Sequence, residues 1–279
     1  MNGWEDIENR KYPPIGRCIY CGSDGGPDGL RDEHMIPYSL GSYAELEEAS
    51  CRNCEAITSY IDGYLSRNTF YELRAHVGAP SRGKLPSTLS AKLLVGDQEF
   101  IREFLAADQP FSLILPTWDL PGILRQVQPS PDFPVYNLRA YNFIPKNFRE
   151  TLGLADDAPD PMVQISPGKI NNITFARAIA KIAYCHAIAK YGLNGLRRLV
   201  LPDIILGRYP WVPYFVGSDS GTPPPRDPRD VRDVVGFRTA TGRNGLRLLC
   251  AGVRLFAHSG SPETGMPIYW VVMGAPLET

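Results

Sequence analysis

The sequence predicts an α+β protein whose N-terminal part is stapled by zinc. Two Cys-x-x-Cys pairs, Cys18 with Cys21 and Cys51 with Cys54, have the spacing at which four thiolates close a tetrahedral zinc site. Residues 173–191 carry apolar side chains at helical spacing, and the runs 247–257 and 268–274 are rich in strand-forming residues. We therefore expect a zinc-bearing domain over residues 1–95 and an α+β domain over residues 96–279.

The N-terminal domain is expected to contain two short strands followed by a helix. Residues 17–22 indicate a short strand interrupted by the first cysteine pair, and residues 23–29 indicate a turn-rich loop. A second strand over residues 30–37 carries Glu33 and His34. Apolar residues then recur at helical spacing from residue 49 to residue 75, so the second cysteine pair is expected to open a helix. Residues 79–86 are polar and proline-punctuated, which favours a linker or a strap that contacts a nucleic-acid backbone.

The C-terminal domain gives mixed signals along its length. We expect a short helix over residues 100–105, a strand over 112–116 and short elements in the proline-rich stretch 116–134. The clearest helix covers residues 173–191, with Asn171 or Asn172 as its cap and Gly192 at its end. Residues 218–228 are too rich in proline for regular structure. The runs 247–257 and 268–274 are expected to pair antiparallel, and Cys185 and Cys250 to lie in the core.

Composition narrows the class of protein. Hydrophobic residues make up 43% and charged residues 21% of the chain, and no run approaches the ~20 apolar residues of a membrane span. The first residues lack the pattern of a secretory signal, so we expect a cytoplasmic protein with reduced thiols. A net charge of −1 argues against a protein that coats nucleic acid, but it is compatible with an enzyme that binds the backbone locally.

The residues around the two cysteine pairs form a longer pattern. The first pair is followed by Glu33-His34-x-Ile36-Pro37 and by Ser-Leu-Gly, and the second pair is preceded by Ala-Ser. Over residues 15–75 this pattern resembles the zinc-bearing branch of the HNH endonucleases. The resemblance implies a treble-clef-like ββα-metal finger. Four thiolates leave no open position on the zinc ion, so that ion is structural and the chemistry belongs to a second metal.

The resemblance also implies roles for individual residues. His34 falls on the general base that takes a proton from water. Glu33 falls on a ligand of a catalytic Mg²⁺ or Mn²⁺, and Glu55 stands where the family has an Asn or His ligand. Leu46 stands where the family has an Asn that supports the loop around the base. The implied reaction is hydrolysis of phosphodiester bonds in DNA, which is expected to be double-stranded, and it leaves a 5′-phosphate.

Other interpretations of the same residues remain open. Glu33 and His34 can be an exposed pair on a purely structural zinc finger, and Glu55 can be a surface residue near the positive end of its helix. The chain would then be a non-catalytic, zinc-supported nucleic-acid-binding or regulatory module. By analogy with prokaryotic HNH proteins, the C-terminal domain can act as a sensor or phage-defence regulator, or carry a homodimer or partner contact.

Several cations lie in or just after the zinc-bearing segment. Beside a phosphate-handling module they are candidates for contact with the DNA backbone, and the alternative is a solvated helix face. These residues are Arg52, Arg67, Arg74, Arg82 and Lys84.

Overall fold

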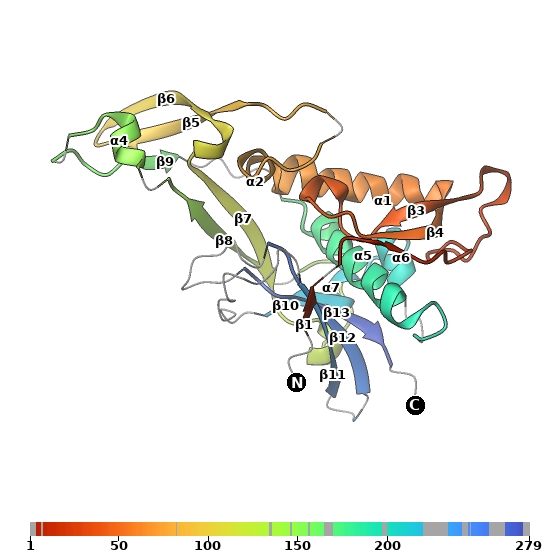
Figure 1. Cartoon of the computed structure of the whole chain (residues 1–279). Coiled ribbons are helices and arrows are strands. Elements are labelled where there is room, and N and C mark those ends of the chain that lie inside the picture. Colours follow the sequence, from red (N-terminus) through yellow and green to blue (C-terminus); the bar gives the residue numbers. More distant parts are fainter. Residues whose placement is uncertain are drawn as a thin grey trace.

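A computed structural model of the chain (Figure 1) describes residues 4–6, 8–81, 83–133, 136–145, 147–155, 157–164, 170–196, 200–219, 234–241, 245, 247–256 and 266–275. These residues form four sheets, and the long helix α5 (Asn172–Tyr191) lies between the N-terminal sheet and the largest sheet. The protein is therefore of the mixed α+β class, as the sequence predicted.

The N-terminal sheet has the strand order β2-β4-β3 and packs against helix α1. Its strands are β2 (Lys11–Tyr12), β3 (Leu30–His34) and β4 (Glu45–Cys51). β3 and β4 pair antiparallel, and α1 (Arg52–Tyr64) begins directly after β4 with Cys51 as its N-cap. The observed order is strand, strand, helix, but two of its bounds differ from expectation. Residues 17–22 form turns, and residues 45–51 form the strand that we expected to be loop and helix.

The helical segment expected over residues 49–75 is interrupted in the structure. After α1 the chain makes a π-helical segment, η3 (Leu65–Thr69), and then a second helix, α2 (Tyr71–His76). Phe70 lies at the junction and is buried. The region is therefore helical, as the spacing of its apolar residues predicted. That spacing did not indicate the break between the two helices.

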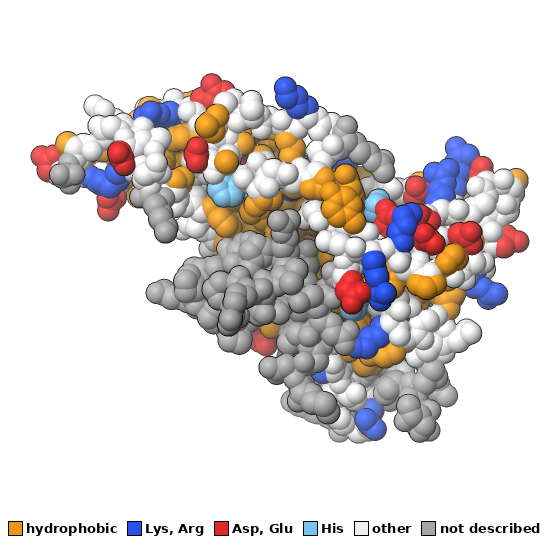
Figure 2. Space-filling model, in the orientation of Figure 1, with side chains coloured by type: hydrophobic (Ala, Val, Ile, Leu, Met, Phe, Trp, Pro, Cys, Tyr) orange, Lys and Arg blue, Asp and Glu red, His pale blue; other side chains and the backbone are white. Residues whose placement is uncertain are grey.

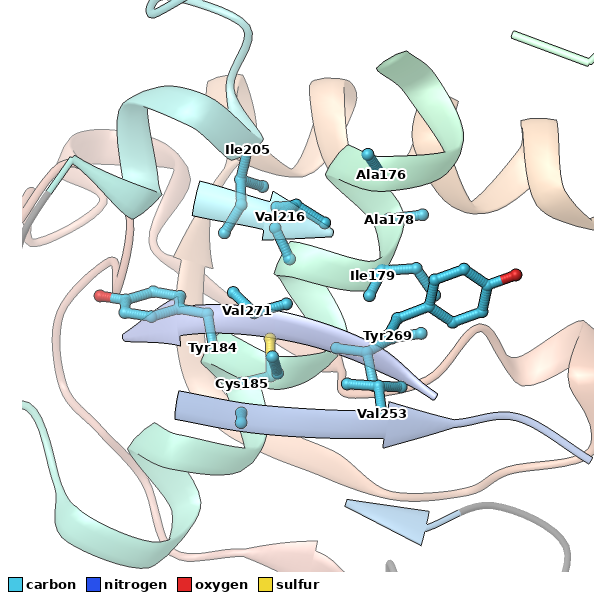
Figure 3. Close-up of a cluster of buried hydrophobic side chains, with 14 of the residues drawn as sticks. Ala176, Ala178, Ile179, Tyr184, Cys185, Ile205, Val216, Val253, Tyr269 and Val271 are labelled. Atoms are coloured by element: carbon cyan, nitrogen blue, oxygen red, sulfur yellow. The ribbon is translucent and has the colours of Figure 1, made fainter. Parts of the chain in front are cut away.

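The largest sheet has the order β1-β11-β12-β13-β10. One of its faces packs on α5, where Ile179 and Cys185 face strand residues such as Val271 (Figure 3). The predicted antiparallel pairing of the last two strands is confirmed. The strands are β1 (Trp4–Asp6), β10 (Val216–Ser218), β11 (Val234–Thr241), β12 (Arg247–Arg254) and β13 (Tyr269–Gly274), and the short helices α6 (Leu201–Ile205) and α7 (Val212–Phe215) precede β10.

Two smaller sheets complete the described chain. One has the order β6-β5-β9, with β5 (Thr88–Val95), β6 (Gln98–Leu105) and β9 (Met162–Gln164), and the other pairs β7 (Phe111–Trp118) with β8 (Tyr136–Phe143). The turn between β5 and β6 falls where the sequence placed the boundary between residues 95 and 96. The remaining short helices are η1 (Gly26–Asp28), η2 (Tyr38–Leu40), η4 (Ala106–Asp108), α3 (Gly122–Arg125) and α4 (Phe148–Leu152).

Two expectations for the C-terminal half had opposite outcomes. The helix expected over residues 100–105 is wrong, because this segment is strand β6, in which Ile101 is 71% exposed while Phe104 is buried. Apolar runs this short do not separate helix from strand. The predicted long helix is confirmed: Asn171 caps α5 by accepting the Thr174 N–H at 2.9 Å, and Gly192 ends it. Cys185 and Cys250 are buried, as predicted.

The larger of two hydrophobic clusters among the described residues joins the N-terminal segment to the C-terminal sheet. It contains Ile61 and Leu65 from the first 95 residues together with Ile179 and Val271 from the remainder. Residues 218–228, expected to be a loop, fall mostly outside the described part of the chain. None of the helices that the structure describes has both the length and the apolar character needed to cross a membrane.

Candidate functional site

The four cysteines of the two pairs meet in space. Their Sγ atoms all lie within 4.8 Å of one another, and those of Cys21 and Cys51 are 3.6 Å apart. Four sulfurs bound to zinc at about 2.3 Å in a tetrahedron would be separated by about 3.8 Å. The donor set and its spacing therefore fit a zinc ion.

Local backbone structure places these thiols. The N–H of Cys18 donates to Ser23 O at 2.7 Å, and the N–H of Gly22 donates to Cys18 O at 2.8 Å, so the first pair sits on a tight turn. Cys51 ends β4 and caps α1, which carries Cys54 in its first turn. Helix α5 also holds the turn that carries Cys18 and Cys21, because the Tyr184 hydroxyl donates to Ile19 O at 2.7 Å.

An irregularity between β3 and β4 sets the position of Glu33 and His34. Arg31 pairs with Ser50, but Glu33 pairs with Leu46 and His34 with Glu45, so β4 has more residues than β3 across this interval. Glu48 lies in the bulged stretch with φ of 48°, a conformation that is uncommon for a residue other than glycine. The bulge brings Glu45 directly opposite His34.

Glu33 points into the protein, where it meets a buried lysine from α5. Its side chain is 4% exposed, and its Oε1 lies 3.1 Å from Nζ of Lys181, whose side chain is 0% exposed. The Thr58 hydroxyl donates to the other oxygen, Oε2, at 3.2 Å. Both carboxylate oxygens of Glu33 are therefore engaged inside the fold.

Lys181 has two further partners. Its ammonium donates to Asp62 Oδ2 on α1 at 2.7 Å and to the backbone oxygen of His34 at 2.6 Å. Burial disfavours the charged form, but the carboxylates of Asp62 and Glu33 outweigh it and raise the pKa of Lys181. We call Glu33, Lys181 and Asp62 the buried triad. It has two carboxylates and one ammonium, so it carries a net negative charge when all three groups are ionised.

That charge imbalance shows in the pKa of Asp62. Burial raises the pKa of Asp62 to about 6, against the opposing effect of Lys181, and Glu33 adds to the rise. One proton on the triad would neutralise it. The raised pKa of Asp62 favours binding of this proton at the Asp62 carboxyl group.

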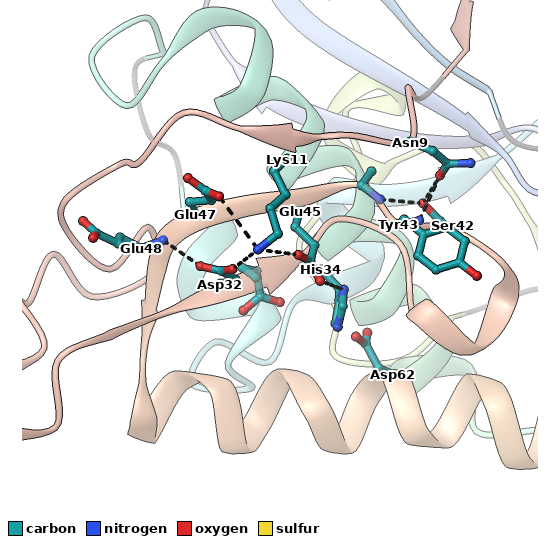
Figure 4. A network of polar contacts seen from close by, with 12 residues as sticks. Asn9, Lys11, Asp32, His34, Ser42, Tyr43, Glu45, Glu47, Glu48 and Asp62 are labelled. Atoms are coloured by element: carbon teal, nitrogen blue, oxygen red, sulfur yellow. Dashed lines mark hydrogen bonds and ion pairs between the residues drawn. The ribbon is translucent and has the colours of Figure 1, made fainter. Parts of the chain in front are cut away.

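His34 lies on the open side of the same strand. Its Nδ1 is 3.0 Å from Glu45 Oε1, and the Asp62 carboxylate points toward the ring from α1 (Figure 4). The ring borders a cavity of about 570 Å³. A carboxylate beside Nδ1 favours the proton on that nitrogen. The cavity is lined by Asn9, Arg10, Lys11, His34, Tyr38, Tyr43 and Glu45.

Lys11 balances the acidic side chains around this cavity. Its Nζ lies 2.7 Å from Asp32, 3.3 Å from Glu45 and 3.8 Å from Glu47 (Figure 4). The hydrogen bond from Lys11 lowers the pKa of Asp32, and Asp32 in turn raises the pKa of Lys11. Asp32 also accepts the N–H of Glu48 at 3.3 Å, which ties it to the bulge.

The two carboxylates expected to bind a catalytic metal are not brought together as ligands. Glu33 is held by Lys181 and Thr58, while Glu55 Oε2 lies 2.7 Å from Arg31 on the exposed side of α1. Among the described residues, the four cysteines are the only group of three or more His, Cys, Asp or Glu side chains placed so that they could hold a metal ion together. In this structure both carboxylates of the expected second metal site are held by other side chains. Leu46 is fully buried opposite Glu33.

The cations expected at a DNA backbone have different surroundings. The expectation that Arg74 contacts the DNA backbone is wrong, because this side chain lies inside the fold. It is 5% exposed, and it donates to Ser39 O at 2.6 Å and to Ser66 O at 3.0 Å. Arg52 is exposed and pairs with Asp28 at 3.3 Å. Arg67 borders a separate cavity beside α2, Lys84 is exposed, and Arg82 lies outside the described residues.

Basic and acidic side chains alternate over the N-terminal sheet and α1 in the face drawn in Figure 2. On that face blue and red groups lie next to each other, in keeping with the pairs that Lys11, Arg31 and Arg52 form. Their positive charge is therefore largely compensated by neighbouring carboxylates.

Sequence reasoning missed Lys181, Asp62 and Glu45. The signal for Lys181 was a lone cation in an otherwise apolar stretch of the predicted helix, since a lysine there needs an acidic partner. Asp62 follows Thr58 by four residues, so both lie on one face of α1. Glu45 had no signal, because its place opposite His34 depends on the bulge.

Comparison with known proteins gives no relative for this chain. No family model, no curated protein and no solved structure matches it.

Proposed function

We propose that this chain is an endonuclease of the HNH type that hydrolyses phosphodiester bonds in DNA, with His34 as the general base. The observation that carries the proposal is the placement of the His34 ring at an open cavity, with Glu45 at Nδ1 and with Arg10 and Lys11 in the wall. An oriented imidazole beside cations is a combination suited to activating water against a phosphate diester.

The proposed step follows from these contacts. Nε2 of His34 accepts a proton from a water molecule while the water oxygen attacks phosphorus, and Glu45 stabilises the imidazolium that forms. The bond between phosphorus and the 3′ oxygen breaks, and the leaving oxygen takes a proton from solvent. The products are a 5′-phosphate and a 3′-hydroxyl. Arg10 is 60% exposed and pairs with the exposed Glu8 at 2.7 Å, so it would exchange this partner for a phosphate.

The Mg²⁺ or Mn²⁺ that the resemblance implies has no part in this step. Holding it between Glu33 and Glu55 would require Lys181 and Arg31 to leave their partners. A structural zinc at the cysteines is compatible with the step, since it fixes the turn and helix on either side of β3.

Cleavage of a supercoiled plasmid by the zinc-loaded full chain tests the proposal. We expect nicked or linear DNA, and His34→Ala should slow cleavage by about 100-fold or more, because general-base catalysis contributes at least that much. His76→Ala, which removes a histidine far from β3 in the sequence, is the matched control and should cleave at the wild-type rate. Resealing of the nicks by ligase without prior phosphorylation would identify the 5′-phosphate. Cleavage by His34→Ala at the wild-type rate would contradict the proposal.

One observation favours a second candidate, the non-catalytic nucleic-acid-binding or regulatory module. The engagement of Glu33 by Lys181 removes the carboxylate that the resemblance assigns to the metal. For such a module we expect DNA binding without cleavage, both with and without added Mg²⁺ or Mn²⁺. A plasmid shift that His34→Ala leaves unchanged would support this candidate.

A further inference from the structure

The ammonium of Lys181 sits where three oxygen atoms converge. They come from the Glu33 carboxylate at 3.1 Å, the Asp62 carboxylate at 2.7 Å and the His34 backbone carbonyl at 2.6 Å. An ammonium has three N–H donors, and each has a partner here. The set of two carboxylates and a carbonyl is also one that a hard divalent cation would choose.

We infer that Lys181 is a built-in cation that replaces a divalent metal in this site and so closes it to Mg²⁺ and Mn²⁺. The inference concerns the same site as the proposed function and rests on it only for the role of His34. Lys181 is a positioning residue, because a side chain with 0% exposure cannot touch a phosphate in the cavity.

Burial explains why a metal would not displace this lysine readily. To enter, a divalent ion would have to expel the ammonium from a site between β3, α1 and α5, and the ammonium would lose all its partners inside a hydrophobic core. Unpaired buried charges are strongly unfavourable. The oxygens around Nζ are also spaced for N–H donors and not for the 2.0–2.1 Å contacts that Mg²⁺ demands.

The position of Lys181 also has a consequence for His34. By holding the His34 carbonyl and the Asp62 carboxylate at once, the ammonium fixes the end of β3 relative to α1, with the imidazole between Glu45 and Asp62 (Figure 4). Lys181 therefore fixes the geometry around His34, a structural role that a bound metal would otherwise have. Contact with the phosphate would come from cations in the wall of the cavity.

Mn²⁺ binding to the zinc-loaded full chain tests the inference without any need for activity. Free Mn²⁺ is followed by electron paramagnetic resonance in wild type, Glu33→Gln and Lys181→Met, with Lys92→Met as a control for loss of an exposed lysine. We expect the wild-type and Glu33→Gln titrations to coincide. Lys181→Met should gain an Mn²⁺ site, and the double variant Lys181→Met with Glu33→Gln should lose it again.

Two results would contradict the inference about Lys181. A wild-type Mn²⁺ site that Glu33→Gln weakens by about tenfold or more would overturn the inference. Should Lys181→Met not fold, the comparison of wild type with Glu33→Gln still decides, and Glu33→Asp provides a second variant for it. A failure of the proposed function is distinguishable, because an inactive protein that binds no Mn²⁺ at Glu33 leaves the inference standing. Cleavage that requires a Glu33-dependent metal would overturn it while supporting the nuclease.

Discussion

The four-cysteine cluster and the buried triad lie on the two ends of β3 and α1, yet they are assembled in different ways. All four sulfur ligands come from residues 18–54, in two pairs with the same internal spacing. The triad joins Glu33 and Asp62 to Lys181, which lies 119 residues beyond Asp62 in the sequence. The first centre holds its own segment together, whereas the second ties that segment to the helix beneath the C-terminal sheet.

Loss of the zinc site is expected to be the most damaging change. Cys54→Ser should lose the bound zinc and the tertiary structure of β3, β4 and α1, because such an ion contributes about 10 kcal/mol to the folding of small zinc domains. Metal analysis and near-ultraviolet circular dichroism measure the two effects. Cys250→Ala changes a buried cysteine of β12 outside the zinc cluster. This variant should keep its zinc, and its free energy of unfolding should fall by about 1 kcal/mol. A Cys54→Ser protein with a full zinc complement would show that the cluster does not bind the ion.

Removal of the triad's cation should come next. Lys181→Met leaves Glu33 and Asp62 without their buried partner, which is expected to lower the free energy of unfolding by about 3–5 kcal/mol. Lys92→Met, which breaks an exposed pair with Glu99, should change it by about 0.5 kcal/mol or less. Urea unfolding followed by fluorescence measures both. Equal effects of the two substitutions would mean that the triad adds little to stability.

The raised pKa of Asp62 predicts a smaller effect that depends on pH. The folded state holds the Asp62 proton up to about pH 6, whereas the unfolded chain releases it near the ordinary value of 3.8. The folded state therefore binds more protons between these values, so stability falls as pH rises from about 4 to about 6, by up to about 3 kcal/mol. Asp62→Asn should lack this fall.

Urea unfolding of wild type and Asp62→Asn from pH 4.5 to 7.5 measures the difference between the two curves. Asp32→Asn serves as a control of opposite sign. Its pKa is lowered by Lys11, so Asp32 stabilises the fold above its unfolded pKa, and that contribution is lost as the pH falls. Parallel curves for wild type and Asp62→Asn would contradict the assignment of the proton to Asp62.

The same contrast explains how much of the molecule could be predicted from sequence. The zinc ligands and α5 were within reach because each depends on local spacing, Cys-x-x-Cys in one case and an apolar helical period with an Asn cap in the other. β6 was mistaken for a helix, since a short apolar run has no decisive period. The triad was out of reach because it needs the packing of α5 on β3, and the pairing of His34 with Glu45 needs the bulge in β4.

Helix α5 serves both halves of the protein at once. On this helix, Lys181 pairs with Glu33, and Tyr184 bonds the turn that carries Cys18 and Cys21. Neighbouring residues of the helix pack on the large sheet. A fragment that stopped at residue 95 would keep every zinc ligand and still lack the counter-charge for the buried Glu33 and the partly buried Asp62. We therefore expect the zinc-bearing segment to be less stable as an isolated fragment than in the full chain, because α5 supplies the partner of Glu33.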